Sequence, residues 1–311
     1  MIDHLPSVLV IAGPTASGKS ALALALAEQL DGVVINADSQ QSYRDLPILT
    51  ARPSAADEAR VPHRLFGELG PQERDSAPGW ALRAAAEINA AIAFGKRPIV
   101  VGGTGLYLQA LMVGMPAMPE IPAETRASAR ALLDDIGHVA FHARLAARDP
   151  VLGAKLKSGD TQRILRAWEV VEATGRPLSA WQADPPVSPI AVTFRAVVLL
   201  PPREDLNAAS DARFEAMLAA GALEEVRALL ETGIAPTAAI LRVLGARPLS
   251  QHLGGEIDLA TAAGLAKTAT RQYAKRQTTW FRHHFPAALT ISEQFSERKL
   301  PIIFPKIREL S

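Results

Sequence analysis

The sequence predicts an α/β protein in which helices flank a parallel sheet and an all-helical insertion interrupts the α/β core. Short apolar runs alternate with helical segments over the first third of the chain. Prolines at 116–122 and again at 185–189 then break this pattern on either side of a mostly helical stretch. Strand-helix alternation is typical of parallel sheets covered on both faces. We therefore expect an α/β core with C-terminal helices at residues 1–115 and 190–311, and an insertion at 116–189.

Each expected element has its own signal. The strands are short apolar runs, and two of them end in polar or glycine-rich residues at the same edge of the sheet. The clearest helix of the insertion begins after Asp160, a possible N-cap, and ends at Gly175. The expected strands are residues 7–12, 32–37, 97–101 and 190–200, and the expected helices are residues 20–30, 79–94 and several within 207–284.

Composition limits the classes of protein that the chain can represent. Its 311 residues are 48% hydrophobic and 21% charged, which is the balance of a globular protein. The absence of cysteine excludes disulfides, thiolate metal sites and a cysteine nucleophile. The net charge is only +1, so a nucleic-acid partner would require basic residues gathered on one face.

The sequence favours a cytoplasmic protein with no membrane partner. The N-terminus lacks the basic region of a signal peptide. The longest uncharged run, residues 98–119, could be mistaken for a membrane span. Glycines and prolines interrupt it, so strand, loop and short helix are the expectation there.

A phosphate-binding loop lies between the first strand and the first helix. Residues 13–20 match the pattern G-x-x-x-x-G-K-[ST] in the strand-to-helix context that this motif requires. Glycines let backbone N–H groups turn toward a phosphate, Lys19 adds a full charge, and the Ser20 hydroxyl suits Mg²⁺. The diphosphate-binding residues predicted from this loop are Gly13, Pro14, Thr15, Ala16, Ser17, Gly18, Lys19 and Ser20.

The loop does not identify the reaction by itself. An Asn-Lys-x-Asp motif for reading guanine is absent, which disfavours a GTPase. The third strand ends in Gly-Gly-Thr instead of the acidic residue that motor and transport ATPases usually carry. The classes of P-loop protein still compatible with the sequence are kinases of small molecules and other enzymes that use diphosphates.

A carboxylate and a hydroxyl follow the second and third strands. Ligands of doubly wound sheets lie over the carboxyl ends of the strands, so Asp38 and Thr104 are expected to face the phosphate. Asp38 could serve as a general base or an indirect Mg²⁺ ligand, and Thr104 could hydrogen-bond an acceptor or the phosphate. A purely structural turn formed by Asp38 with Ser39 is the alternative.

The C-terminal helical region carries a basic stripe. No acidic residue occurs between Asp258 and Glu293. At helical spacing Tyr273 and Trp280 fall on the other side, toward the core. Such a stripe suits a phosphate backbone, although a solvated helix face would look similar. The stripe consists of Lys267, Arg271, Lys275 and Arg282.

Several separated motifs together resemble the tRNA dimethylallyltransferase family, also called tRNA isopentenyltransferases, in its bacterial form. The resemblance extends over most of the chain, and it implies a P-loop NTPase-like fold. The motifs are residues 13–20, Asp38-Ser39 with Gln41 and Tyr43, Pro62-His63-Arg64-Leu65, residues 101–107, Asp160 with Gln162-Arg163, Gly175-Arg176-Pro177, Arg213 with Met217 and Gly221, and residues 270–277 leading to Thr279-Trp280.

The resemblance implies transfer of a dimethylallyl group from dimethylallyl diphosphate to N6 of the adenosine 3′ of the tRNA anticodon. Lys19, the loop amides and Arg213 would neutralise the departing diphosphate, with Mg²⁺ near Ser20. Asp38 would accept a proton from, or orient, N6 of a flipped-out adenine, with Thr104 assisting. The implied catalytic residues are therefore Asp38, Thr104, Lys19 and Arg213, and the protein is expected to be a monomer.

The implied partner is the anticodon stem-loop of tRNA, which the insertion would contact. Ala246, Gln40 and Ser42 depart from residues usual in the family, which affects the contacts expected around the adenine. The zinc finger of eukaryotic members is absent, since there is no cysteine. The expected tRNA-binding residues are Asp38, Ser39, Gln40, Gln41, Thr104, Arg126, Gln162, Arg163, Arg166, Arg242, Arg247, Arg271, Lys275, Arg276 and Arg282.

Two other functions are compatible with the motifs. A small-molecule or nucleoside kinase would place ATP in the loop, Asp38 as base toward a hydroxyl, and arginines of the insertion as a phosphate-clamping lid. A noncatalytic RNA-binding protein would use the loop only to grip an RNA phosphate.

Overall fold

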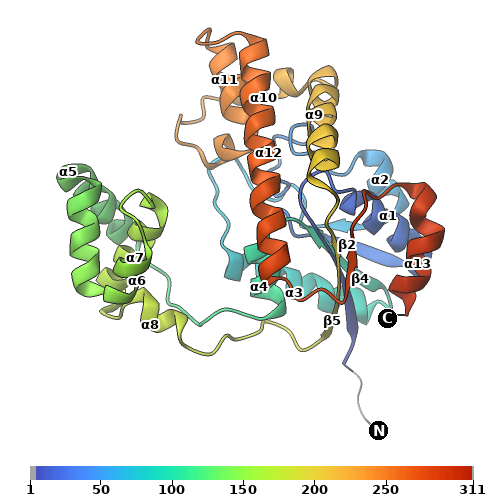
Figure 1. Ribbon diagram of the computed structural model, residues 1–311, viewed down its shortest axis with the longest axis horizontal. Helices are drawn as coiled ribbons and strands as arrows, with labels where there is room; N and C mark the ends of the chain where they lie inside the picture. Colours follow the sequence, from blue (N-terminus) through green and yellow to red (C-terminus); the bar gives the residue numbers. More distant parts are fainter. Residues whose placement is uncertain (1–4, 310–311) are drawn as a thin grey trace. The chain divides into compact units, whose positions relative to one another are not determined.

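The computed structural model describes residues 5–309 and divides into two compact units (Figure 1). The core unit comprises Met1–Met112 and Pro189–Ser311, and the insertion unit comprises Val113–Ser188. The sequence predicted an insertion at 116–189. No helix within residues 5–309 has both the length and the apolar character required to span a bilayer.

The core unit contains one six-stranded sheet of order β3-β2-β4-β1-β5-β6, in which all neighbouring strands are parallel. The predicted parallel α/β sheet is therefore confirmed. Two short edge strands were not predicted, because two or three residues carry no readable alternation. The strands are β1 (Ser7–Ala12), β2 (Gly32–Asn36), β3 (His63–Arg64), β4 (Arg97–Gly102), β5 (Thr193–Leu199) and β6 (Leu289–Ile291).

Alternating side chains bury both faces of the sheet. Leu9 and Ile11 of β1 belong to an apolar cluster that includes side chains of α1 and α13. The intervening Val8 and Val10 are also fully buried and point to the opposite face. α3 packs on β2 and β4, and α4 packs on α3. The bounds are α1 (Lys19–Leu30), α2 (Ala55–Arg60), α3 (Ala77–Ala93), α4 (Gly105–Met112) and α13 (Leu300–Arg308).

A second group of helices packs beside the sheet in the core unit. Figure 1 shows the long α12 alongside α9 and α11. Their apolar side chains belong to one cluster, which includes Phe214 of α9, Leu249 of α11 and Ala266 of α12. Asp258 caps the N-terminus of α12, and its carboxylate accepts from the Thr261 N–H at 2.7 Å. The helices are α9 (Arg203–Ala219), α10 (Ala222–Glu231), α11 (Ala246–Leu253) and α12 (Leu259–His284), with a short 3₁₀ turn at Ala239–Arg242.

The insertion unit has its own core. Phe141 and Trp168 pack with ring centroids 5.3 Å apart among buried aliphatic side chains. The predicted helix after Asp160 is confirmed, and Gly175 ends it with a φ of 68°. The Asp160 carboxylate accepts from the Lys157 N–H instead of capping the helix. The helices are α5 (Ala123–Arg148), α6 (Pro150–Lys155), α7 (Thr161–Thr174) and α8 (Leu178–Gln182).

Candidate active site

The loop between β1 and α1 has the backbone of an anion-binding loop. Ala16 and Gly18 adopt positive φ angles of 63° and 88°. A Cβ on Gly13 would lie 2.7 Å from the Leu199 carbonyl oxygen, so only glycine allows β1 to pass β5 this closely. Lys19 is 8% exposed, and its Nζ lies 3.3 Å from the Pro14 carbonyl oxygen. The lysine side chain thus folds back over the phosphate loop, where its charge would add to the loop amides in binding an anion.

The C-terminal segment of the chain also holds this loop, which the sequence did not reveal. Gln294 donates to the Ala16 carbonyl at 2.7 Å, and the Phe295 N–H donates to the Ser17 carbonyl at 3.4 Å. A Cβ on Gly18 would lie 2.9 Å from Phe295, so the glycine provides the space for this contact. The loop is therefore fixed by tertiary contacts as well as by its own turns.

Two cations and one carboxylate act on each other across the loop. The Arg213 guanidinium of α9 donates a hydrogen bond to the Thr15 hydroxyl. Burial lowers the pKa of Lys19 to about 8, an effect that Asp38 opposes and Arg213 reinforces. Burial also lowers the pKa of Arg213, and Asp38 counteracts it. Lys19 and Arg213 thus form a positively charged site with Asp38 as its counter-charge.

Asp38 is held by its own backbone environment. The residue is 9% exposed, and its Oδ1 accepts from the Gln40 N–H at 3.0 Å. Asn36, which is fully buried, accepts from the Asp38 N–H at 2.8 Å and donates to the Asp38 carbonyl at 3.0 Å. The turn that the sequence offered as an alternative role is therefore present, and it leaves the second carboxylate oxygen without a hydrogen bond to any residue within 5–309.

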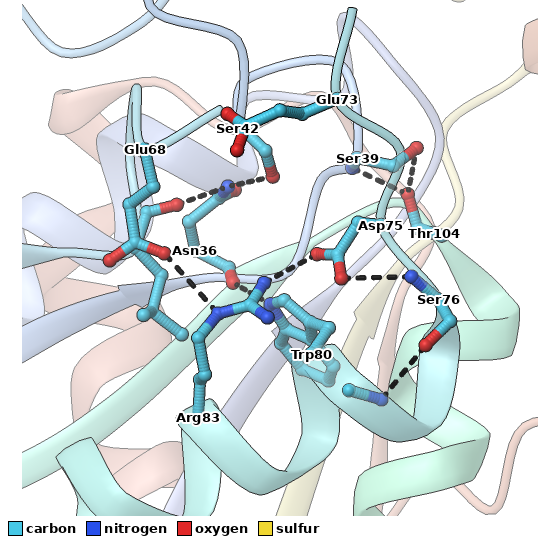
Figure 2. Close-up of polar contacts among 12 residues, drawn as sticks. Asn36, Ser39, Ser42, Glu68, Glu73, Asp75, Ser76, Trp80, Arg83 and Thr104 are labelled. Carbon is cyan, nitrogen blue, oxygen red and sulfur yellow. Dashed lines mark hydrogen bonds and ion pairs between the residues drawn. The ribbon is translucent and has the colours of Figure 1, made fainter. Parts of the chain in front are cut away.

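A buried aromatic pair, Trp80 of α3 and Tyr107 of α4, lies beside Asn36. Trp80 donates from Nε1 to the Asn36 carbonyl at 2.9 Å and stacks on Tyr107 at 4.7 Å. Figure 2 shows this contact beside the ion pair of Arg83 with Asp75, which is 2.6 Å long. The loop that carries Asp38 is thus anchored to a rigid helix of the core.

Thr104 lies beside the Asp38 loop, as the strand-end argument required. Its Oγ1 accepts from the Ser39 N–H at 2.9 Å and lies 3.2 Å from the Ser39 hydroxyl (Figure 2). A Cβ on Gly102 would lie 2.1 Å from the Ala37 carbonyl oxygen, so the glycine lets the two strand ends meet. Thr104 therefore joins the ends of β2 and β4.

A small pocket brings these groups together. Thr15, Asp38 and Arg213 line it, and apolar side chains close its other side. Tyr273 also lines the pocket and hydrogen-bonds with Thr104 and Gln40, and burial raises its pKa to about 12. Tyr273 therefore lies on the inward side of its helix, as expected, where it faces this pocket. The apolar lining consists of Leu49, Phe214, Met217 and Leu244.

The basic stripe on α12 is partly neutralised. Lys267 pairs with Glu215, and Arg271 pairs with Asp211 at 2.7 Å. The sequence could not reveal this, because both acids belong to α9. Lys275, Arg276 and Arg282 are exposed, and within residues 5–309 none of them forms an ion pair. Trp280 packs over Gly105, whose Cβ would lie 2.5 Å from the indole ring.

The remaining predicted tRNA contacts are spread over both units. Gln41 is not free to read a base edge with its amide nitrogen, which donates to the carbonyls of Thr50 and Ala51 at 3.0 and 2.7 Å. Gln40 accepts from the Leu244 N–H at 2.9 Å. The exposed residues of this group are Arg242 and Arg247 in the core unit and Arg126, Gln162 and Arg163 in the insertion unit. Arg166 is half-buried and lies close enough to Arg126 for their charges to interact.

The site suits Mg²⁺ that arrives with a diphosphate. Within residues 5–309 no cluster of three His, Asp or Glu side chains is suited to a cation. The Ser20 side chain is exposed at the start of α1, beside the loop amides. Mg²⁺ commonly takes one or two protein ligands and completes its shell with phosphate oxygens and water.

The fold and site define the class of the protein: a P-loop protein with a carboxylate and a hydroxyl at the strand ends next to the loop. A model of the IPP transferase family matches residues 41–284, and a model of isopentenyl transferases matches residues 6–66. The chain belongs to the IPP transferase family.

Named relatives extend over nearly the whole chain. A tRNA dimethylallyltransferase of Paramagnetospirillum magneticum is 52% identical over 301 residues, which cover 97% of this chain and 96% of the relative. One of Rhodospirillum centenum is 55% identical over 282 residues, 90% of each. These names match the prenyl-transfer interpretation of the sequence instead of the kinase alternative.

Solved structures agree with this assignment. A tRNA isopentenylpyrophosphate transferase of Staphylococcus epidermidis has a TM-score of 0.69 and 29% identity over 98% of this chain and 100% of that one. A eukaryotic dimethylallyltransferase acting on tRNA has a TM-score of 0.80 and 27% identity over 98% of this chain and 80% of that one. The predicted P-loop NTPase-like fold is confirmed.

Proposed function

We propose that this protein transfers a dimethylallyl group from dimethylallyl diphosphate to the exocyclic N6 of the adenosine on the 3′ side of a tRNA anticodon. The observation that carries the proposal is that Asp38 and Arg213 line one pocket, with Lys19 of the adjoining loop close enough to interact electrostatically with both. The cations suit a leaving diphosphate, and the carboxylate suits the amine that attacks.

The proposed reaction requires one displacement. The C1–O bond of the donor breaks, its electron pair leaves with the diphosphate, and N6 forms a new bond to C1. The proton that N6 loses passes to Asp38, whose second oxygen has no hydrogen bond to the described residues. Lys19, Arg213 and the loop amides stabilise the negative charge on the diphosphate. Mg²⁺ beside Ser20 would add further charge neutralisation.

The apolar side of the pocket suits the prenyl group. Phe214 and Met217 project from α9, the same helix that carries Arg213. One helix thus presents both a cation for the diphosphate and apolar surface for the five-carbon chain. The acceptor adenine must be unstacked to reach this pocket, since a base within a stacked loop is inaccessible.

The proposed partner is the anticodon stem-loop of tRNA, which would bind to α12 and to the insertion unit. The protein would act as a monomer in the cytoplasm. The direct test incubates the protein with Mg²⁺, dimethylallyl diphosphate and unmodified tRNA that has adenosine 3′ of an anticodon ending in A. Mass analysis of the digested nucleosides should show C₅H₈ added to adenosine only when the donor is present. No such product, together with ATP consumption on small acceptors, would contradict the proposal.

The exposed cations of α12 should contribute to tRNA affinity more than the paired ones. The logarithm of tRNA affinity falls as the logarithm of salt concentration rises, and each phosphate contact contributes about 0.7 to 0.9 to the steepness of that slope. Replacing Lys275 and Arg276 by alanine should therefore make the slope shallower by about 1.4 to 1.8. Arg271→Ala is the matched control on the same helix, and its ion pair with Asp211 should make its effect on the slope smaller. Filter binding between 50 and 300 mM salt measures the slopes. Equal slopes for the parent and the double variant would contradict the RNA-binding role.

Diphosphate affinity should weaken at alkaline pH because Lys19 titrates. The pKa of Lys19 is about 8, so the side chain is charged below pH 8 and loses its proton above it. The KM for dimethylallyl diphosphate should therefore about double from pH 7 to pH 8 and then rise toward tenfold per pH unit. In Lys19→Arg the guanidinium stays charged, and its KM should change little over the same range. A parent KM that stays flat to pH 9.5 would exclude Lys19 as the titrating group.

A further inference from the structure

Gln277 of α12 connects the two halves of the active site. Its side chain is buried, 6% exposed. Oε1 accepts from the Thr15 N–H of the phosphate loop at 2.8 Å, and Nε2 donates to the Gly103 carbonyl at 2.8 Å. The second contact lies one residue before Thr104. One amide thus spans the gap between the loop after β1 and the loop after β4.

The surroundings are shaped for this amide. A Cβ on Gly103 would lie 2.3 Å from Nε2 of Gln277, so the backbone approaches the amide at a distance that only glycine allows. A buried amide is costly unless both of its polar ends are satisfied, and here each end has one backbone partner.

We propose that Gln277 is a positioning residue that sets the separation between the phosphate loop and Thr104. The proposal rests on the prenyl-transfer function proposed above. Thr15 is fixed twice, through its N–H by Gln277 and through its hydroxyl by Arg213. Because α12 also carries Lys275 and Arg276 on its exposed face, the helix proposed to bind RNA also holds the diphosphate loop in place. Misplacement of reacting groups by about 1 Å can cost about 100-fold in rate.

Two variants of Gln277 separate positioning from packing. Gln277→Met keeps the volume and removes both hydrogen bonds, so kcat should fall by about 100-fold. The affinity for inorganic pyrophosphate with Mg²⁺, measured by calorimetry, should also fall. Thr278→Val is the control on the same helix turn, where the hydroxyl bonds only to the Ala274 carbonyl of its own helix, and it should retain parental kcat.

Gln277→Glu provides a readout that a packing role would not produce. Its ionised carboxylate can accept from Thr15 but repels the Gly103 carbonyl, whereas the protonated acid can make both contacts. Burial raises the pKa of such a carboxyl, so the activity of Gln277→Glu relative to the parent should increase several-fold from pH 8 to pH 6. This pH dependence of the ratio of Gln277→Glu to parent activity does not depend on the folding of Gln277→Met.

The outcomes distinguish this proposal from the proposed function. Near-parental kcat and pyrophosphate affinity in Gln277→Met, or an activity ratio of Gln277→Glu that is flat with pH, would overturn the positioning role. If the parent forms no prenylated nucleoside, the proposed function fails. In that case the pyrophosphate affinities of the parent, Gln277→Met and Gln277→Glu at pH 6 and 8 still decide whether Gln277 positions the loop.

Discussion

Replacing Asp38 by asparagine should lower kcat for prenyl transfer by about 10²–10⁴-fold, the usual contribution of a positioned proton acceptor. Asparagine preserves the hydrogen bond from the Gln40 N–H, so the loop should keep its conformation. The amide cannot accept the proton that N6 releases. Steady-state kinetics with tRNA and dimethylallyl diphosphate measure the effect.

The KM for the donor should not rise when kcat falls. Asp38 is the counter-charge of Lys19 and Arg213, so its removal leaves two cations that attract the diphosphate more strongly. Asp38→Asn should therefore have an unchanged or lower KM for dimethylallyl diphosphate. Asp31→Asn is the control, because this exposed residue ends α1 in the left-handed conformation that asparagine tolerates. If kcat of Asp38→Asn stayed within threefold of the parent, Asp38 would not be the proton acceptor.

The parts of the site that the sequence predicted are those set by local geometry. The phosphate loop needs a glycine pattern between a strand and a helix, and all of its residues are consecutive. Asp38 and Thr104 follow two strands of a parallel sheet, and parallel strands bring their carboxyl ends to one edge. Both arguments use spacing and periodicity alone. For the same reason the strands predicted at 7–12, 32–37 and 97–101 differ from β1, β2 and β4 by one residue at most.

Contacts between distant segments could not be predicted in the same way. Gln277 reaches a residue 174 positions away, and nothing in its helical periodicity distinguishes a buried bridging amide from a packed one. The basic stripe looked continuous because its acidic partners, Asp211 and Glu215, lie on another helix. The charge pattern of one helix therefore does not establish a basic surface, because acidic residues of a neighbouring helix can pair with its cations.

The family resemblance supplied what neither periodicity nor spacing could. Arg213 has no local motif that marks it as a phosphate ligand, and in the sequence it is one of several arginines on helices. The departures at Gln40 and Ala246 are accommodated by the structure: Gln40 accepts from the Leu244 N–H, and Ala246 is fully buried at the start of α11. Gln40 lines the pocket, and neither position belongs to the phosphate loop at residues 13–20.

Replacing Arg213 by glutamine should lower kcat/KM by about 10²–10³-fold, as expected when a buried group that stabilises developing charge is lost. Glutamine can still donate to the Thr15 hydroxyl, so the change removes mainly the charge. The diphosphate gains negative charge as the C1–O bond breaks, so the loss should fall on kcat more than on the KM for the donor.

Guanidinium rescue distinguishes a charge effect from a folding defect. Millimolar guanidinium chloride should restore part of the activity of Arg213→Gln, because the small cation can enter the space that the side chain leaves, and it should not affect the parent. Arg203→Gln is the control on the same helix, since this residue is exposed at the start of α9. Near-parental kcat/KM in Arg213→Gln would show that Lys19 and the loop amides suffice to stabilise the leaving diphosphate, and Arg213 would then be assigned only to holding Thr15.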